Sequence, residues 1–498
     1  MVHDTRSPEA KLAVAVIGCG AAGLVTAREL LREGLNVTVY EQSSHLGGVW
    51  KYEEEVEDDL RNPSKRVHSS MYQDLRTNLP RQLMSFSDFP LTVECLGPKS
   101  LDPRRYCSHQ EVLRFLERFA DEYQLWEHIR FNAKVVSIRP IASDSPASPH
   151  MSARACMAPG WGWAVATQST EPGSTSSDSV VAEFDAVVSC IGNYSEPNLP
   201  DVDGMEAFPG RQLHCHNYRR PDAFAGQTVL VVGASFSGEE IARRIAAVAR
   251  HVFHAARSWP APPGVQPAPC AGVTRLSMLQ RLTSRGEAFF QGGECVQGIE
   301  SIVYATGYKY SYPFLDELDL ISTDDMRVAP LYKHIFPPAV APSLGFIGLL
   351  WKSVRNMQFE LQAKYVARVL SGRVVLPSRA SMEADIQTFQ DLLERAGVPV
   401  RYTHNQSDAM PVDQWAYNDW LAEACGEDVP RPAGWRRRMH TLLSSLIFGR
   451  PDSFRDQALP GEEELYAEAD AACARMWQQH QEHKRDITQN SGLAACRD

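Results

Sequence analysis

Two strand–turn–helix units with glycine-rich turns constrain the fold of this 498-residue chain more than any other feature. In the first unit, the short apolar run at 12–17 leads directly into Gly18, Gly20 and Gly23, after which apolar residues recur at helical spacing. A buried parallel strand, a turn without side chains and a helix make up a dinucleotide-binding β-α-β unit. The next strand ends at Glu41, whose carboxylate is placed to accept hydrogen bonds from ribose hydroxyls. A 2′-phosphate would be repelled there, so this turn is predicted to bind FAD or NAD and not NADPH.

The second unit starts with the apolar run at 228–232, which is followed by Gly233, Ser235 and Gly238. In such turns the first glycine permits the tight bend and the third permits close packing of helix on strand, while the middle residue faces the pyrophosphate. A serine in the middle leaves this turn less open than the first. The strand-end position holds Arg257, and an arginine can bind a 2′-phosphate through charge-assisted hydrogen bonds. The second turn is therefore predicted to prefer NADPH to NADH; a solvated surface arginine is the alternative interpretation.

Two such units in one chain predict an α/β fold with two Rossmann-like dinucleotide-binding domains, because a single doubly wound domain needs only one glycine turn. We place the first domain at 1–197, a second domain inserted in it at 198–312, and the return of the first domain with a helical tail at 313–498. The stretch at 140–182 is rich in Ser, Pro, Ala and Gly and is expected to be a loop interrupted by one strand. The stretch at 259–285, which begins Pro-rich, is expected to be an irregular surface segment.

The composition excludes several functional classes. A net charge of -11 leaves no broad basic surface, so neither nucleic acid nor an anionic membrane is expected as a partner. No run of about 18 apolar residues and no apolar signal core is present, so neither a membrane anchor nor secretion is predicted. The eleven cysteines include no C-x-x-C pair, which predicts neither a dithiol redox centre nor a metal site. A cytoplasmic protein is expected, and a homodimer is one assembly that the sequence allows.

A third motif lies between the two glycine turns. Phe208, Gly210, His214 and Tyr218 match the pattern F-x-G-x-x-x-H-x-x-x-Y. At this point the chain resembles the flavin-containing monooxygenases, which are class B flavoprotein monooxygenases. Baeyer–Villiger relatives usually carry Trp at the last position, so Tyr218 favours oxygenation of a heteroatom. By its residue type alone His214 is interpreted as a hydrogen-bonded structural histidine, and we assign it no acid–base step.

Three further stretches carry the same resemblance. EQSSHLGGVWKY resembles a family segment in which Gly48 and Trp50 would flank the flavin, and IVYATGYKY holds the A-T-G-Y motif with Thr306 and Gly307 near the cofactors. DLRTNLP resembles the segment that carries the family's active-site asparagine, here Asn78. Without the resemblance, an asparagine before Leu-Pro would also fit a simple turn former.

The resemblance covers about residues 12–425 and implies a chain with an NADPH-binding domain inserted in an FAD-binding domain. It also implies a flavin-dependent monooxygenase: NADPH reduces FAD, O2 then forms a C4a-hydroperoxyflavin, and a soft nucleophile attacks the distal oxygen. No protein nucleophile is needed, but the pocket must exclude water, and the neutral Asn78 amide can orient the reacting groups without adding charge.

The target atom follows from a narrower resemblance. The segments around 331–351 and 359–378 resemble the plant S-oxygenase branch, which includes glucosinolate S-oxygenases. Thioether sulfur is therefore the favoured target and amine nitrogen the second; an N-hydroxylating enzyme, a Baeyer–Villiger-type enzyme and an NADPH oxidase are the alternatives. One departure stands out, because Arg355, Asn356 and Gln358 occupy a stretch that is Pro-rich and apolar in the branch. The substrate is accordingly expected to differ in polarity from the norm of the branch.

Overall fold

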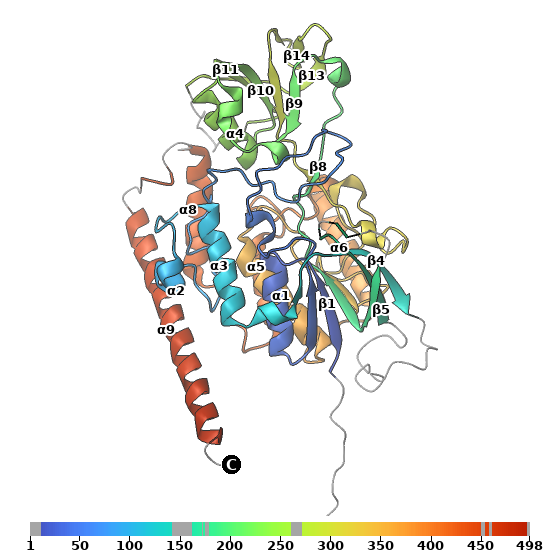
Figure 1. The fold of residues 1–498 in the computed structure, drawn as a ribbon, viewed down its shortest axis with the longest axis vertical. Helices are drawn as coiled ribbons and strands as arrows, with labels where there is room; N and C mark the ends of the chain where they lie inside the picture. Colours follow the sequence, from blue (N-terminus) through green and yellow to red (C-terminus); the bar gives the residue numbers. More distant parts are fainter. Residues whose placement is uncertain are drawn as a thin grey trace, which may run out of the picture.

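The computed structural model describes residues 11–141, 162–171, 173–174, 179–259, 271–449, 454–457 and 461–495. These residues form a larger body and a smaller domain that stands on one end of it (Figure 1).

The larger body is organised by a parallel sheet with the strand order β18-β7-β1-β2-β3. Its strands are β1 (Ala13–Ile17), β2 (Asn36–Tyr40), β3 (Ile129–Arg130), β7 (Ala186–Ser189) and β18 (Leu344–Phe346). Both faces are buried, with Val14 and Val16 in one apolar cluster and Ala15 and Ile17 in another. Because β1 is the strand from which the chain moves outward in both directions, the turn after β1 opens at the switch point where α/β sheets bind ligands.

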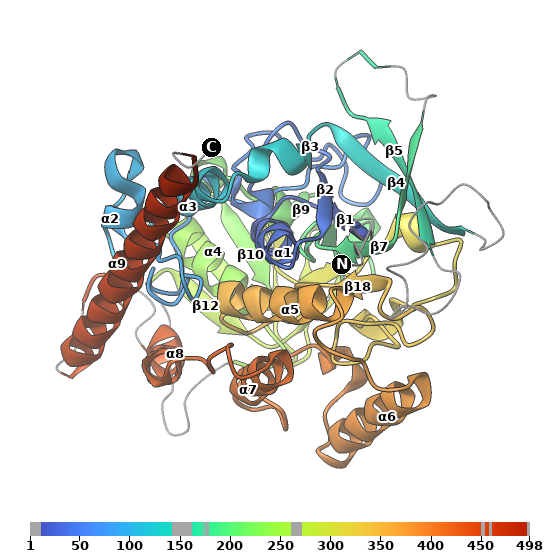
Figure 2. The ribbon, with the colours of Figure 1, turned by 90° about the horizontal axis from the view of Figure 1, so that it is seen from below.

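Helices cover one face of this sheet and a second sheet covers the other. α1 packs against α5, with α3 beside α1 and α7 beside α5 (Figure 2). Their bounds are α1 (Ala21–Arg32), α3 (His109–Glu122), α5 (Arg355–Leu370) and α7 (Gln414–Cys425). The covering sheet is antiparallel and consists of β4 (Ala133–Ile141), β5 (Gly162–Ser169) and β6 (Val180–Phe184).

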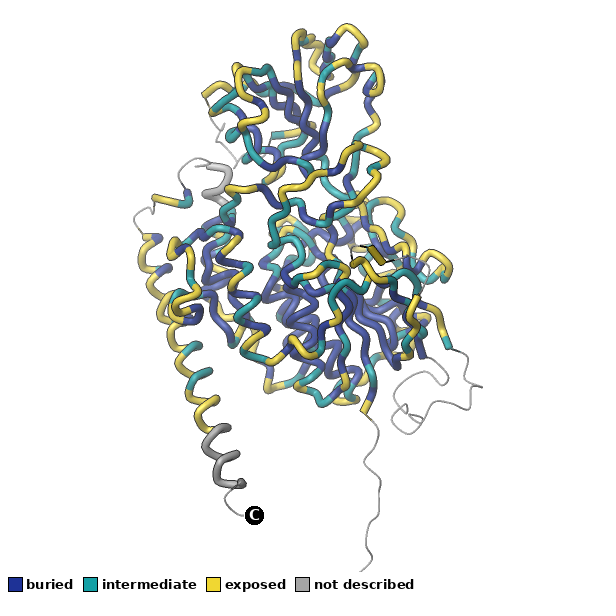
Figure 3. The backbone as a smooth tube through the Cα atoms, viewed as in Figure 1, coloured by how far each residue is buried: buried dark blue, intermediate teal, exposed yellow. Residues whose placement is uncertain are grey.

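The smaller domain repeats the plan with a parallel sheet in the order β12-β11-β10-β16-β9. Its elements are β9 (Arg211–His214), β10 (Thr228–Val232), α4 (Phe236–Ala246), β11 (His251–Ala255), β12 (Val273–Leu276) and β16 (Ser301–Tyr304). Val229 and Val231 share a cluster with Ile241 and Ile245 of α4, whereas Leu230 belongs to the cluster on the opposite face. The sheet is therefore buried on both faces, as the dark core in Figure 3 shows, and the predicted pair of Rossmann-like units is confirmed.

The expectation for 259–285 is wrong in its described part. Residues 260–270 lie outside the described residues, but β12 follows them and extends the parallel sheet, and β13 (Leu279–Leu282) forms a small antiparallel sheet with β14 (Ala288–Phe290) and β15 (Cys295–Val296). Leu276, Leu279 and Leu282 are buried and make these strands part of the core. The prediction failed because β12 and β13 are only four residues long each and directly follow a Pro-rich stretch that is typical of loops. The strand expected inside 140–182 is present as β5.

The chain passes between the two units through two linkers that pair with each other. β8 (Glu196–Pro197) and β17 (Tyr308–Lys309) run antiparallel, and the Asn198 amide donates to the Gly307 carbonyl oxygen at 2.9 Å. Further helices flank the larger body, with α9 along its side (Figure 1): α2 (Val93–Leu96), α6 (Arg379–Arg395), α8 (Gly434–Gly449) and α9 (Glu462–Ala495). Across the described ranges, every helix is too short or too polar to cross a membrane.

Candidate active site

The first glycine turn forms a strip of backbone that no side chain covers. At Gly18 the backbone φ is +100°, and a Cβ atom there would lie 2.7 Å from the carbonyl oxygen of Cys190. A Cβ on Gly23 would lie 1.9 Å from the Gly18 carbonyl oxygen, so this position needs glycine to let α1 approach β1. Gly20 and Gly48 face each other, since a Cβ on Gly48 would lie 3.1 Å from the Gly20 Cα. The strip therefore admits a ligand close to the backbone at the start of α1, as a pyrophosphate requires.

Glu41 stands at the end of β2 with its carboxylate held in place. One oxygen accepts from the Cys19 backbone N–H at 2.8 Å, and the other accepts from the Ser43 N–H at 2.8 Å and the Ser43 hydroxyl at 2.9 Å. The residue is only 7% exposed, yet it lines the cavity described below. The oxygen that accepts only from Cys19 retains acceptor capacity, so Glu41 is prepared to bind a ribose hydroxyl.

The second glycine turn has the same construction. Gly233 has φ +110°, and a Cβ there would lie 2.3 Å from the Ala305 carbonyl oxygen, while one on Gly238 would lie 1.8 Å from the Gly233 carbonyl oxygen. Ser235 occupies the N-cap position of α4 with extended backbone angles that any residue adopts, and its side chain is exposed. The serine therefore costs the turn no strain and faces the space where a phosphate would lie.

Arg257 follows β11 and is exposed at the wall of the same cavity, and within the described ranges no carboxylate pairs with it. Two further arginines, Arg243 of α4 and Arg275 of β12, also line this wall. Arg275 donates to Glu239 at 3.4 Å and stacks over Trp259 at 4.6 Å. Sequence reasoning missed Arg275, because only the pairing of β12 with β11 brings it to the cavity that Arg257 lines.

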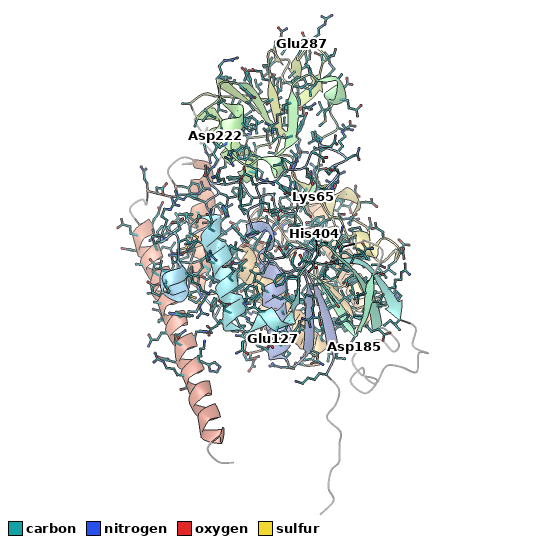
Figure 4. All side chains as sticks on the ribbon, in the orientation of Figure 1. Lys65, Glu127, Asp185, Asp222, Glu287 and His404 are labelled. Carbon is teal, nitrogen blue, oxygen red and sulfur yellow. The ribbon has the colours of Figure 1, made fainter. Side chains whose placement is uncertain are left out.

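Both turns open into one cavity of about 2530 Å³ that runs along the junction of the two units. Every predicted site residue except Gly23 and Gly238 lines it; those two instead pack helix on strand. Lys65, another lining residue, marks the level of the junction in Figure 4. Pockets for one small ligand commonly measure about 300–1,000 Å³, so this space suits two dinucleotides and a substrate.

Asn78 lies on the wall of this cavity in the loop before Pro80. The preceding Thr77 N–H donates to the Cys107 carbonyl oxygen at 2.9 Å, which holds the loop. Asn78 and Leu79 lie in a bend, and within the described chain the Asn78 side-chain amide makes no hydrogen bond. The amide remains available to a ligand. Trp50 also lines the cavity and packs against the core of the larger body.

The third motif and the A-T-G-Y segment meet at the junction. His214 is fully buried, its Nδ1 accepts from the His216 backbone N–H at 3.1 Å, and burial lowers its pKa to about 3. It is therefore neutral at ordinary pH, in keeping with a structural histidine. Its ring meets that of Tyr308 edge-on, with centroids 5.1 Å apart. The Thr306 hydroxyl donates to the Asn198 carbonyl oxygen at 2.6 Å and so ties the motif to the other linker.

Three cations near the start of α5 and in the segment before α7 line the cavity. Arg355, the first residue of α5, contacts the Tyr194 hydroxyl, donates to the Asn193 side-chain oxygen at 3.4 Å and lies over the Tyr194 ring at 4.6 Å. Lys352 and Arg401 line the same cavity. Among the described residues none of these three cations has a carboxylate within 4.0 Å. Their charge is available to a negatively charged group.

A family model described as flavin-binding monooxygenase-like matches residues 11–260 and 270–430. The chain belongs to this family. Membership confirms the predicted resemblance and the prediction of a flavin-dependent monooxygenase that uses FAD and NADPH.

The relatives of this monooxygenase extend over nearly its whole length. Flavin-containing monooxygenase FMO GS-OX-like 2 of Arabidopsis thaliana is 42% identical over 461 residues, which are 92% of this chain and 93% of the relative. The structure of S-allyl-L-cysteine S-oxygenase from Allium sativum is 37% identical, covers 94% of this chain and 99% of its own, and superposes with a TM-score of 0.82. OTEMO, solved in complex with FAD and NADP, shares the fold at 16% identity over 79% of this chain and 91% of its own, with a TM-score of 0.53.

Proposed function

We propose that this monooxygenase holds FAD on the first glycine turn and NADPH on the second, and oxygenates the sulfur of a small thioether. The observation that carries the proposal is that both turns open into a single cavity. The FAD contacts would come from Gly18, Gly20, Glu41, Gly48 and Trp50, and Gly23 would let the helix reach them. The NADPH contacts would come from Gly233, Ser235 and Arg257, with Gly238 in the packing role and Thr306 and Gly307 at the junction.

The electrostatics of the two turns support this order of cofactors. The carboxylate of Glu41 favours free ribose hydroxyls and repels a 2′-phosphate, whereas the guanidinium of Arg257, which has no carboxylate partner among the described residues, attracts one. Residues 198–312 would then form the NADPH-binding domain, between two parts of the FAD-binding domain at 1–197 and 313–498. When bound, the flavin supplies the redox and oxygen chemistry, and the chain supplies position and shelter from water.

Asn78 would orient the reacting groups. Its amide offers donors and an acceptor but no charge, and it lines the cavity without a competing hydrogen bond in the described chain. A misplaced oxygen donor would be lost as hydrogen peroxide, so the proposed task of Asn78 is to keep NADPH oxidation coupled to product.

Support for sulfur comes from the relative in Allium sativum, whose name gives an S-oxygenation, and from Tyr218 in the third motif. Arg355, which lines the cavity without a carboxylate partner among the described residues, favours a substrate that carries a negative group at some distance from the sulfur. A reducing compartment, and so the cytoplasm, is supported by the eight described cysteines, which are all unpaired although seven are buried.

The experiment compares Asn78→Ala with the wild-type holoenzyme and with Asn62→Ala, an exposed asparagine outside the cavity. Product and hydrogen peroxide are each measured per NADPH consumed. We expect Asn78→Ala to release most of its reducing equivalents as peroxide and Asn62→Ala to match the wild type. If Asn78→Ala forms as much product per NADPH as the wild type, Asn78 has no role in coupling NADPH oxidation to oxygenation.

A second measurement identifies the oxygenated atom. The wild-type enzyme is supplied in turn with a thioether, a tertiary amine and a cyclic ketone, and the products are analysed. Sulfoxide as the main product supports the proposal. An N-oxide as the main product would instead indicate an enzyme that oxygenates nitrogen, and a lactone a Baeyer–Villiger-type enzyme. Peroxide alone with all three compounds would indicate an NADPH oxidase.

A further inference from the structure

A short segment of the C-terminal region, Phe454–Gln457, lies across the junction of the two units. Phe454 is 4% exposed and packs edge-on against Tyr106 of the larger body, with ring centroids 5.4 Å apart. Asp456 accepts two hydrogen bonds from Arg76 at 2.8 and 3.0 Å. These two neighbours anchor the segment on the larger body and leave Arg455, between them, on the wall of the cavity.

Arg455 makes contacts with both units. Its Nε donates to the carbonyl oxygen of Thr77 at 2.9 Å, and that carbonyl belongs to the peptide group that joins Thr77 to Asn78. Its Nη2 donates to the Glu240 carboxylate at 2.8 Å. Glu240 lies in the first turns of α4, two residues after Gly238. One planar guanidinium thus connects the loop of Asn78 with the helix that begins at the second glycine turn.

The ion pair between Arg455 and Glu240 is largely shielded from water. Both side chains are only 13% exposed. Burial alone would raise the pKa of Glu240, but the neighbouring Arg455 and Arg244 together lower it. Arg244 donates to the same carboxylate at 3.0 Å and to the Asp74 carbonyl oxygen at 2.9 Å. Charged groups held this way in a shielded site keep a defined geometry, unlike exposed surface pairs.

We propose that Arg455 is a positioning residue that couples occupation of the second glycine turn to the placement of Asn78. This inference rests on the proposed roles of that turn and of Asn78. A pyrophosphate bound at the start of α4 would fix that helix, and the Glu240 carboxylate would then hold the guanidinium. The guanidinium in turn holds the Thr77 carbonyl, so a nucleotide that fixes α4 would also hold the loop of Asn78 more firmly.

The test uses Arg455→Met, which keeps the length of the side chain but removes charge and hydrogen bonds, and Arg455→Lys, which keeps the charge. Glu240→Gln and the double variant Glu240→Gln/Arg455→Met complete a cycle. The control is Arg438→Met, which removes an exposed ion pair with Glu468 in the same C-terminal region. For each purified holoenzyme, peroxide and product per NADPH, kcat, KM for NADPH and the affinity for NADP+ are measured.

Arg455→Met is expected to raise the share of NADPH lost as peroxide at least about fivefold, in the range of ordinary coupling between sites. Arg455→Lys should restore part of the coupling, and the double variant should be no worse than the more affected single variant, because both break one connection. Arg438→Met should match the wild type. A role confined to anchoring the tail would lower the melting temperature but leave the peroxide share unchanged.

Wild-type coupling in Arg455→Met, or fully additive effects in the double variant, would overturn the inference. If Arg455→Met does not retain flavin, the same comparison is made with Arg455→Lys and Glu240→Gln, and wild-type coupling in both overturns it equally. Failure of the role proposed for Asn78 would give a different result: Asn78→Ala would form as much product per NADPH as the wild type. Uncoupling in Asn78→Ala with normal coupling in the Arg455 variants refutes only the role of Arg455.

Discussion

Replacement of Arg257 by alanine should change which nicotinamide cofactor the enzyme prefers. Arg257 follows β11 of the smaller domain, lines the cavity and has no carboxylate partner among the described residues. Its guanidinium is therefore free to meet a 2′-phosphate, the group that distinguishes NADPH from NADH. A charge-assisted hydrogen bond contributes about 1.5–3 kcal/mol, and because Arg257 is exposed we expect the lower half of this range.

A loss of about 1.5–2 kcal/mol corresponds to a fall of about 10- to 30-fold in kcat/KM for NADPH. For NADH, which lacks the phosphate, kcat/KM should stay within about twofold, since Arg257 would contact nothing else in that cofactor. The assay is steady-state oxidation of each cofactor by the wild type, by Arg257→Ala and by the control Arg250→Ala. Arg250 is also an exposed arginine of the smaller domain, but it pairs with Glu300 and lies outside the cavity.

An unchanged preference in Arg257→Ala would refute the assignment of Arg257 to the phosphate. An equal fall with both cofactors would refute it too, because it would mean that the residue supports the domain and not the phosphate. In either case Arg243 or Arg275, which line the same wall, would be the arginine to test next.

Three more outcomes are expected. Glu360→Gln should lower the free energy of unfolding by about 3 kcal/mol, because it removes a 1%-exposed carboxylate that accepts a hydrogen bond from buried Arg28 at 3.0 Å. Urea unfolding measures this loss. The control Glu383→Gln, which breaks an exposed ion pair with Arg379, should lose much less stability. Acidification from pH 7 to 5 should destabilise the fold, because burial lowers the pKa of His216 and His404 to about 4 each, so the unfolded chain binds more protons in this window. At pH 5 each histidine lowers the free energy of unfolding by roughly 2 kcal/mol relative to neutral pH. Urea midpoints that stay the same at pH 7 and pH 5 would contradict this expected loss of stability. Arg355→Met should raise KM for anionic thioethers about tenfold and leave neutral ones unchanged, and equal effects on both would remove the guanidinium from substrate recognition.

The local units of the fold could be predicted because each depends on a short stretch of chain. Gly18 and Gly233 have φ near +100°, a conformation that side chains other than glycine rarely adopt, so each leaves a visible mark in the sequence. β1 and β10 are buried on both faces, and such strands require the continuous apolar runs that the sequence contains. The strands at 273–282 were missed since short apolar runs after a Pro-rich stretch resemble loop.

The amino-acid sequence by itself determined that two dinucleotide-binding turns exist, and which of them carries a carboxylate and which an arginine at its strand end. These properties are local, because glycine conformation and strand burial depend on a few neighbouring residues. Only the tertiary structure decided that both turns share one cavity, that Arg275 lines this cavity together with Arg257, and that Arg455 reaches from the C-terminal tail to Thr77 and Glu240. Contacts between residues hundreds of positions apart depend on how the units pack, and a single sequence carries no periodic pattern that records them.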